Sequence, residues 1–131
     1  MNATLLLHRS LRIAAAFGLS ALLALDARAA GDADRGQALY QSRCAACHSI
    51  DYNGVGPAHK GVFGREAGQA TGFDYSPALK ASHLIWTEAN LDRWLTDPEK
   101  LVPGQRMNFS VPDAKDRADL IAYLQKAATP K

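Results

Sequence analysis

Apolar side chains recur at helical spacing in three stretches of the chain, which cover residues 32–43, 88–96 and 113–128. No stretch shows the strict apolar–polar alternation of a half-buried strand, so the pattern predicts an all-α domain. In chain order, the three apolar stripes consist of Gly36, Leu39 and Tyr40, of Leu91, Trp94 and Leu95, and of Leu120, Ile121, Tyr123, Leu124 and Ala127.

Polar residues mark the ends of these helices. Asp32 and Asp34 lie at the start of the first helix, where the helix dipole favours acidic side chains. Thr87 and Asp113 are suited to cap the second and third helices, because their side-chain oxygens accept hydrogen bonds from free backbone N–H groups. Pro98 predicts the end of the second helix, since proline excludes the residue before it from helical geometry.

The segments between the helices are predicted to be loops. Residues 49–72 are rich in glycine but lack the glycine order of a phosphate-binding loop, and no strand precedes them. A short helical turn is expected at 76–79, with Pro77 near its first position. Residues 99–111 form another loop, punctuated by proline and glycine. We expect the glycine-rich loop over 49–72 to wrap over a buried group.

The first 29 residues resemble a secretory signal peptide. Arg9 and Arg12 precede an apolar run over 13–25, and small residues follow at the expected cleavage site after Ala29. The alternative is an uncleaved anchor, but such a run is only about 20 Å long as a helix, against a hydrocarbon core of about 30 Å. We therefore expect a cleaved signal at 1–29 and one domain at 30–131.

The expected signal carries the excess positive charge of the chain. The whole sequence has a formal net charge of +2, but 1–29 contains three arginines and one aspartate. Residues 30–131 are therefore formally neutral, which gives no support to nucleic-acid binding.

The strongest chemical signal is the sequence Cys44-Ala45-Ala46-Cys47-His48. Two thiols three positions apart, followed by an imidazole, form the attachment signature of c-type haem: both sulfurs bond the porphyrin and the histidine binds the iron. The alternatives are a redox-active cysteine pair followed by an unrelated histidine, and a zinc site, for which the chain lacks a second cysteine pair.

Taken together, the motifs of the chain resemble a class I cytochrome c, of the subgroup that includes mitochondrial cytochrome c and bacterial cytochromes c2. The resemblance covers nearly all of 30–131. Besides the haem attachment signature, it includes Gly36 with Tyr40, Gly56-Pro57, Gly61-Val62-Phe63-Gly64-Arg65, Gly68-Gln69, Gly72-Phe73 with Tyr75, Trp86, Pro98, Pro103-Gly104 with Met107, and Asp119-Leu120-Ile121-Ala122-Tyr123-Leu124.

The resemblance implies a small all-α cytochrome c fold, in which the N- and C-terminal helices cross and loops enclose one covalently attached haem c. It implies that Cys44 and Cys47 hold the haem, and that His48 and Met107 are the axial iron ligands. Three further residues are implied to bind a haem propionate, namely Arg65, Tyr75 and Trp86.

The resemblance also implies contacts around these residues. The Pro57 carbonyl is expected to accept a hydrogen bond from the His48 ring. Gly36 and Tyr40 are expected to pack against the last helix, at Leu120 and Tyr123.

Met107 is also suggested by its own chemistry. Met1 belongs to the expected signal, so Met107 is the one thioether of 30–131. A thioether favours ferrous iron, and His/Met ligation raises the reduction potential. A methionine that fills a gap in the core is the alternative. His59 and His83 are rival ligands, but neither lies in a comparable Pro-Gly loop.

Some positions depart from the mitochondrial pattern. Trp94, Leu79 and Gln105 stand where a tyrosine, an asparagine and a threonine form a polar network near the methionine. We expect bulk to replace part of that network. His59 stands where a leucine usually packs on the haem, and we expect it at the solvent-facing edge rather than as a titrating group near the haem.

These features predict a soluble, monomeric electron carrier of the bacterial periplasm rather than an enzyme, with no stable membrane insertion. The implied partners are a bc1-type complex as donor and an oxidase or photosynthetic reaction centre as acceptor, as in a respiratory or related chain. The basic ring of the family is thinned here, because Glu99 and Asp113 stand where lysines are common, so we expect modest electrostatic steering.

Three alternatives remain at this point. A peroxidase-like or gas-sensing haem protein needs an open iron position, and ready binding of carbon monoxide would indicate it. A haem-free thiol oxidoreductase would have titratable thiols at Cys44 and Cys47. A membrane-tethered carrier would keep its N-terminal segment.

Overall fold

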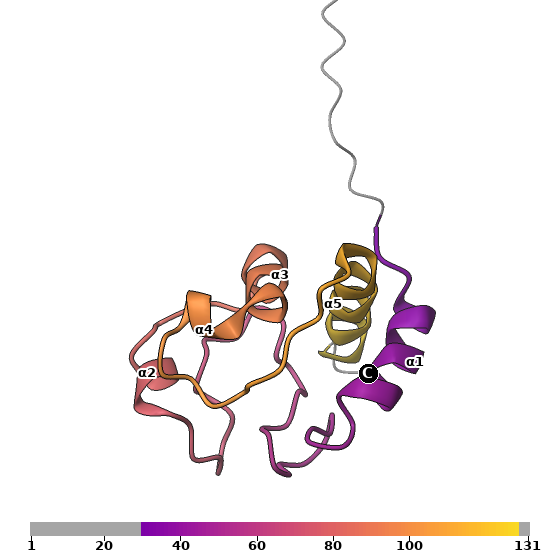
Figure 1. Ribbon diagram of the computed structural model, residues 1–131. Helices are drawn as coiled ribbons and strands as arrows, with labels where there is room; N and C mark the ends of the chain where they lie inside the picture. The colour runs from indigo at the N-terminus through magenta and orange to yellow at the C-terminus, as the bar shows by residue number, and fades with distance from the viewer. Residues whose placement is uncertain (1–29, 129–131) are drawn as a thin grey trace, which may run out of the picture.

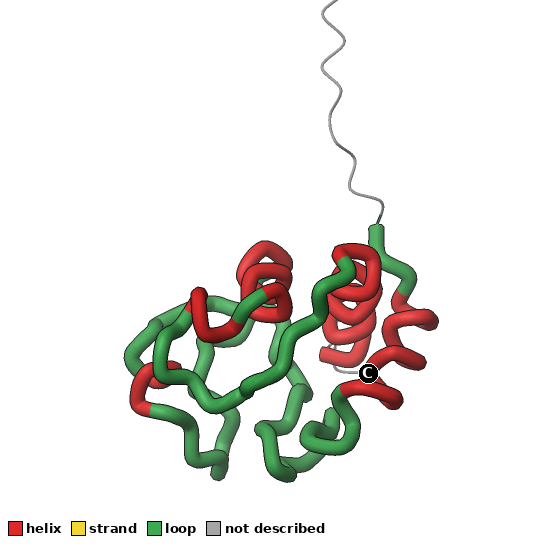
Figure 2. Tube along the Cα trace, in the orientation of Figure 1, coloured by secondary structure: helices red, strands yellow, loops and turns green. Residues whose placement is uncertain are grey.

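The computed structural model describes residues 30–128, and the expected signal peptide at 1–29 lies outside them. Within these residues, five helices follow one another, separated by loops except at α3 and α4, between which only Asp97 lies (Figures 1 and 2). They are α1 (Ala33–Arg43), α2 (Pro77–Lys80), α3 (Glu88–Thr96), α4 (Pro98–Leu101) and α5 (Ala114–Ala128). The described residues contain no strand, only an isolated bridge between Glu66 and Ile85. This confirms the predicted all-α class.

Polar side chains cap the helix starts, as predicted at Thr87 and Asp113, and Asp32 caps α1 as well. The Asp32 side chain accepts from the N–H groups of Asp34 and Arg35 at the start of α1. Thr87 caps α3 in the same way, and Asp113 accepts from the N–H of Asp116 in the first turn of α5. Each cap satisfies backbone donors that the helix itself leaves free.

The prediction of a continuous loop over 99–111 is wrong at its start, where α4 forms. Asp97 ends α3, and its side chain then accepts from the N–H of Lys100 and caps the next helix. Pro98 occupies the first turn of α4, where its missing N–H costs nothing and its fixed φ suits the helix. The same Asp-Pro pair therefore stops one helix and starts another.

The terminal helices α1 and α5 lie side by side, and α3 packs on the other flank of α5 (Figure 1). The α1–α5 contact is made by backbone at close range. A Cβ atom on Gly36 would lie 1.9 Å from the carbonyl oxygen of Asp119, so no larger residue fits there. One turn later, the rings of Tyr40 and Tyr123 are 5.2 Å apart. These contacts confirm the expected crossing.

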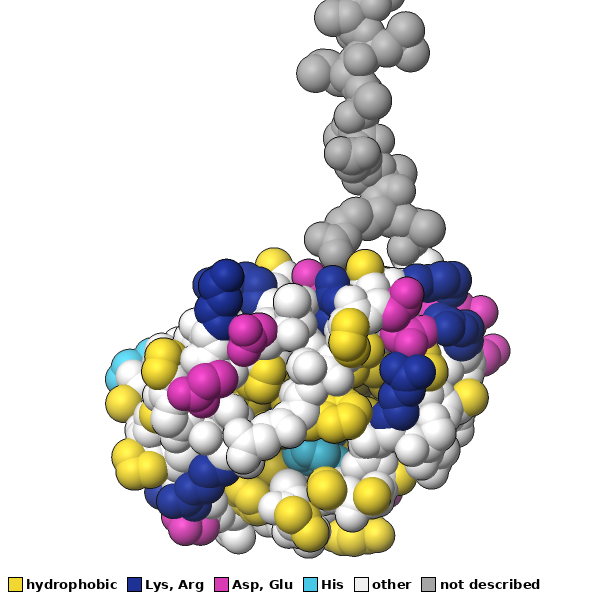
Figure 3. All heavy atoms as spheres, viewed as in Figure 1, with side chains coloured by type: hydrophobic (Ala, Val, Ile, Leu, Met, Phe, Trp, Pro, Cys, Tyr) yellow, Lys and Arg dark blue, Asp and Glu magenta, His cyan; other side chains and the backbone are white. Residues whose placement is uncertain are grey.

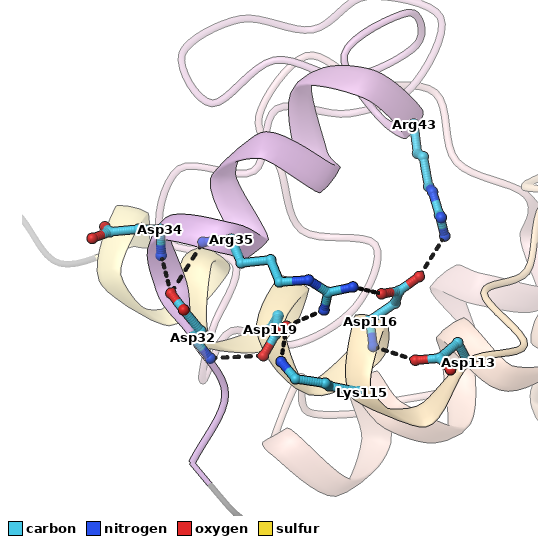
Figure 4. A network of polar contacts seen from close by, with 8 residues as sticks. All are labelled: Asp32, Asp34, Arg35, Arg43, Asp113, Lys115, Asp116 and Asp119. Carbon is cyan, nitrogen blue, oxygen red and sulfur yellow. Dashed lines mark hydrogen bonds and ion pairs between the residues drawn. The ribbon is translucent and has the colours of Figure 1, made fainter.

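A network of charged side chains surrounds this crossing (Figure 4). Arg35 bridges Asp116 and Asp119, and Arg43 binds Asp116 at 2.9 Å. Asp119 is buried, and it also accepts from Lys115 at 2.8 Å. Burial opposes its charge, but the hydrogen bonds from Lys115, from the N–H of Asp32 and from Arg35 outweigh this effect and lower the pKa of Asp119 to about 2.

A second cation joins α5 to the loop before it. The buried guanidinium of Arg117 donates to Asp92 at 2.8 Å. It also donates to the backbone carbonyls of Val111 and Pro112, at 2.9 and 2.7 Å. Arg117 thereby fixes the end of the loop 102–112 against α3 and α5.

Candidate functional site

A cavity of about 510 Å³ lies between the end of α1, the glycine-rich loop, α3 and the loop after α4. Its size is typical of sites for a cofactor-sized ligand. Figure 3 shows histidine atoms deep in a hollow on one face of the molecule, with apolar side chains around it. The predicted site residues all line this cavity, namely Cys44, Cys47, His48, Arg65, Tyr75, Trp86 and Met107.

Cys44 and Cys47 lie in a tight turn that continues from α1. The N–H groups of Cys47 and His48 both donate to the carbonyl of Cys44, at 3.0 and 2.9 Å. Burial raises the pKa of the Cys44 thiol to about 11; Arg43 lowers this pKa and the Cys47 sulfur raises it, but both effects are smaller than that of burial. Redox-active cysteines need a lowered pKa, so this environment argues against a thiol oxidoreductase.

The His48 ring is oriented by the backbone of the following loop. Its Nδ1–H donates to the carbonyl of Pro57 at 2.9 Å, as expected, which leaves Nε2 unprotonated. A Cβ atom on Gly56 would lie 2.3 Å from Cε1 of the ring, so only glycine allows this approach. Burial lowers the pKa of His48, more than the Pro57 hydrogen bond raises it, and the neutral form can bind a metal.

Met107 reaches the same cavity from the loop after α4. Its side chain is partly buried and packs against the core. A turn at Gly104, with φ of 88°, begins this loop, and Arg117 holds its end through the carbonyls of Val111 and Pro112. The structure therefore brings a thioether and an unprotonated imidazole nitrogen to one cavity.

Arg65 provides a test of whether this cavity suits an anionic group. Its two terminal nitrogens donate to the carbonyls of Lys60 and Ala58, at 2.8 and 3.3 Å. Its Nε is buried and has no hydrogen-bond partner among the described residues. A buried donor without a partner is costly, and a carboxylate such as a haem propionate would satisfy it.

Two aromatic side chains line the same cavity as Arg65. Tyr75 is buried, and its hydroxyl accepts from the N–H of Ala70 at 3.2 Å, which leaves its own proton to donate. Trp86 is buried as well and contacts Trp94 edge to face, with ring centroids 5.2 Å apart. The cavity thus fits a large apolar ligand with an acidic edge.

The expectation that His59 is a solvent-facing edge residue is wrong. Its ring stacks on His48 with centroids 4.1 Å apart, and its Nδ1 lies 3.1 Å from the hydroxyl of Tyr40. Burial lowers the pKa of His59 to about 3, with smaller contributions from His48 and Arg65. It is therefore a neutral part of the cavity wall at physiological pH. The sequence feature that could have indicated this placement is its position two residues after Pro57, whose carbonyl contacts His48.

Of the positions that depart from the mitochondrial pattern, Leu79 and Trp94 are buried in the core beside the cavity. This fits the expectation that bulk replaces part of the polar network. Gln105 is buried too, but it remains polar and contacts the backbone of Met107. Nothing in the sequence indicates this contact.

The comparison with protein families identifies the class to which this fold and site belong. The family model "Cytochrome c" matches residues 33–128. The chain therefore belongs to the cytochrome c family, and the helical fold and the cysteine motif place it among the class I cytochromes c. Such proteins carry one covalently attached haem c, and Cys44 and Cys47 have the required spacing.

Two curated relatives share most of the described domain. Cytochrome c2 of Rhodoblastus acidophilus is 48% identical over 101 residues, which are 74% of this chain and 94% of that protein. Cytochrome c of Euglena viridis is 43% identical over 98 residues, or 72% and 96% of the two chains.

A solved structure gives the same result. Cytochrome cH from Methylobacterium extorquens matches with a TM-score of 0.70 and 48% identity, over 73% of this chain and 99% of that one. These relatives support a haem electron carrier. Within residues 30–128, no helix has the length and apolar character needed to cross a membrane.

Proposed function

We propose that the protein is a periplasmic one-electron carrier whose haem iron is bound by His48 Nε2 and Met107 Sδ. The observation that supports this proposal is the meeting of both side chains with Cys44 and Cys47 in one cavity. When bound, the haem supplies a Fe(II)/Fe(III) couple that accepts and releases one electron. The chain positions and tunes that couple.

Each proposed ligand has a defined effect. With His48 and Met107 both bound to it, the haem iron would have no open position for a substrate, which would separate the protein from peroxidase-like enzymes. The hydrogen bond from His48 to Pro57 fixes the ring and makes Nε2 a stronger ligand. The thioether of Met107 favours the ferrous state and raises the potential.

Arg65, Tyr75 and Trp86 are proposed to bind one haem propionate. The unpaired Nε of Arg65 and the free proton of the Tyr75 hydroxyl supply two donors, and the indole N–H of Trp86 supplies a third. These groups would keep the carboxylate ionised inside an apolar cavity, where an unpaired charge is costly.

The proposed setting is the periplasm of a bacterium, after cleavage of residues 1–29. Bacterial relatives named cytochrome c2 and cytochrome cH support this. A bc1-type complex is the proposed donor, and an oxidase or reaction centre the proposed acceptor. We propose a monomer that forms transient complexes with these proteins and binds no nucleic acid.

The experiment is to express the full chain in a bacterium that attaches c-type haem and to purify the product from the periplasm. We expect haem that stays attached on a denaturing gel and a mature N-terminus at Ala30. The reduced protein should not bind carbon monoxide at neutral pH. Ready binding would instead indicate a haem protein with an open position, and a colourless product with two titratable thiols would indicate a thiol oxidoreductase.

A further inference from the structure

The side chain of Gln105 holds the backbone of Met107. Gln105 is only 7% exposed, and its Oε1 accepts a hydrogen bond from the N–H of Met107. The contact lies on the main chain of the proposed ligand itself. Any rotation of this peptide that withdraws the thioether from the cavity would break it.

The other end of the Gln105 amide is held by a carboxylate. Its Nε2 donates to Oε2 of Glu99 at 3.3 Å and lies 3.5 Å from Oδ1 of Asn108. The second oxygen of Glu99 accepts from the N–H of Gly104 at 3.0 Å. Glu99 therefore binds the loop at two points from α4. A donor at one end and an acceptor at the other also fix the orientation of the amide.

Gln105 and Glu99 line a surface hollow of about 370 Å³ that is separate from the haem cavity. Neither residue lines the haem cavity, whereas Met107 lines the cavity and not the hollow, and Asn108 lines both. Gln105 and Glu99 therefore support the loop from outside the haem cavity.

We propose that Gln105 and Glu99 form a clamp that keeps Met107 on the iron and so controls the entry of outside ligands to the sixth coordination position. This inference rests on the proposed function, in which Met107 is an axial ligand. Gln105 and Glu99 are positioning residues, since neither lines the haem cavity. An outside ligand binds only the open fraction of the protein, so its apparent affinity reports that fraction.

The test is a titration of the ferric holoprotein with imidazole, accompanied by carbon monoxide binding to the ferrous form. A neutral hydrogen bond changes an equilibrium by roughly 2- to 12-fold. Gln105→Leu removes the hydrogen bonds to Met107, Glu99 and Asn108 at similar volume, and we expect its apparent imidazole affinity to rise about tenfold or more. Glu99→Ala should raise it severalfold, and Glu99→Gln less, because an amide oxygen still accepts from Gly104.

The control is Gln41→Leu, on the exposed surface of α1, which should bind imidazole as the wild type does. A role limited to overall stability would lower the denaturation midpoint of Gln105→Leu without changing imidazole affinity under native conditions. That result would overturn the clamp. If Gln105→Leu does not yield holoprotein, the Glu99→Ala and Glu99→Gln pair decides, and equal affinities in both and in the wild type would overturn it.

Met107→Ala separates this inference from the proposed function. It should bind imidazole most tightly, and adding Gln105→Leu to it should change nothing further. If Met107→Ala has wild-type affinity, then Met107 is not the ligand and the proposed function fails. If Met107→Ala binds tightly while Gln105→Leu and Glu99→Ala resemble the wild type, the proposed function stands and the clamp is wrong.

Discussion

The two proposed axial ligands are supported in different ways. Around His48, the support is mainly backbone, from the turn at Cys44, the carbonyl of Pro57 and the close approach of Gly56, with the ring of His59 stacked on the imidazole. Around Met107, the support is side chain, from Gln105 and from Arg117 at the end of the loop. Two thioether bonds, to Cys44 and Cys47, would also tie the haem to the histidine side, and none would tie it to the methionine side.

This difference predicts which bond breaks first. Backbone contacts on the histidine side follow from the chain trace, and a change there must move the whole segment. Side-chain contacts on the methionine side can be removed one at a time while the loop keeps its course. We therefore expect the iron–methionine bond to be the adjustable one, and the iron–histidine bond to persist through most substitutions.

The largest expected effect comes from Gly56→Ala, which attacks the backbone support of His48. The new methyl group would lie 2.3 Å from the ring, so the loop or the imidazole must shift. Such overpacking costs about 1–3 kcal/mol or more in unfolding free energy. We expect a low yield of holoprotein and an altered visible spectrum.

Gly61→Ala is the matched control for this change. Gly61 has φ of 64° with no atom within 4 Å of an added Cβ, so alanine there costs only the strain of left-handed backbone, about 1 kcal/mol. Equal spectra and equal unfolding free energies for the two variants would show that the histidine does not depend on the Gly56 contact.

The next effect comes from Arg117→Met, which loosens the far end of the methionine loop. It removes hydrogen bonds to Asp92 and to the carbonyls of Val111 and Pro112, and we expect a loss of about 2–3 kcal/mol in unfolding free energy, measured by guanidinium denaturation. Arg35→Met is the comparison at the α1–α5 crossing. Arg35 is 42% exposed, so its loss should be smaller and should diminish at high salt.

An additional consequence for Arg117→Met separates the two regions. Because Arg117 acts on the methionine loop, its loss should also weaken the iron–methionine absorption band, whereas Arg35→Met should leave that band unchanged. The opposite pattern would contradict the division between the two regions.

A smaller effect is the pH dependence of the unfolding free energy. It is expected from His59 on the histidine side, since the methionine loop and α4, residues 98–111, contain no histidine. Burial lowers the pKa of His59 to about 3, against an unfolded value of about 6.5. Between these values the unfolded chain binds a proton that the folded protein does not. The free energy of unfolding therefore falls as the pH drops below about 6.5, by up to about 1.4 kcal/mol per pH unit.

His59→Leu should reduce this slope. The measurement is the unfolding free energy between about pH 6.5 and 4.5, in wild type and variant. In this window Asp119 contributes little to the slope, because a lowered carboxyl pKa of about 2 withdraws its stabilisation only as the pH falls below about 4. Identical slopes in the two proteins would show that His59 is not held neutral.

The smallest effect concerns the reaction with partners. Arg43 and Arg106 line the haem cavity, but both are already paired, with Asp116 at 2.9 Å and with Asp74 at 3.5 Å. We expect the rate of reaction with a purified oxidase to fall by less than about threefold as the ionic strength rises from ~0.05 M to ~0.2 M. A steep fall would show strong electrostatic steering.

The difference between the histidine side and the methionine side also explains what could be predicted from the sequence. The cysteine motif and His48 form one short segment, and the support from Pro57 follows nine positions later. Helix α3 begins and ends where Thr87 and Pro98 indicate. The sequence does not predict helix α4, because four residues are too few to show a period and Pro98 indicates only the end of α3.

Contacts that depend on the path of the loops could not be predicted. His59 is held by Tyr40, 19 positions away on α1, and only the folded chain brings the two together. Gln105 contacts a residue just two positions away, yet that contact requires the turn at Gly104 and the carboxylate of Glu99. The sequence therefore predicts the ligands better than it predicts their supports.

The most direct test of the account is the visible spectrum and carbon monoxide binding of Met107→Ala holoprotein. We predict that haem stays covalently attached, that the absorption band of the iron–sulfur bond disappears, and that the reduced variant binds carbon monoxide at neutral pH while the wild type does not. An unchanged spectrum with no carbon monoxide binding in the variant would contradict the proposal that His48 and Met107 together bind the iron.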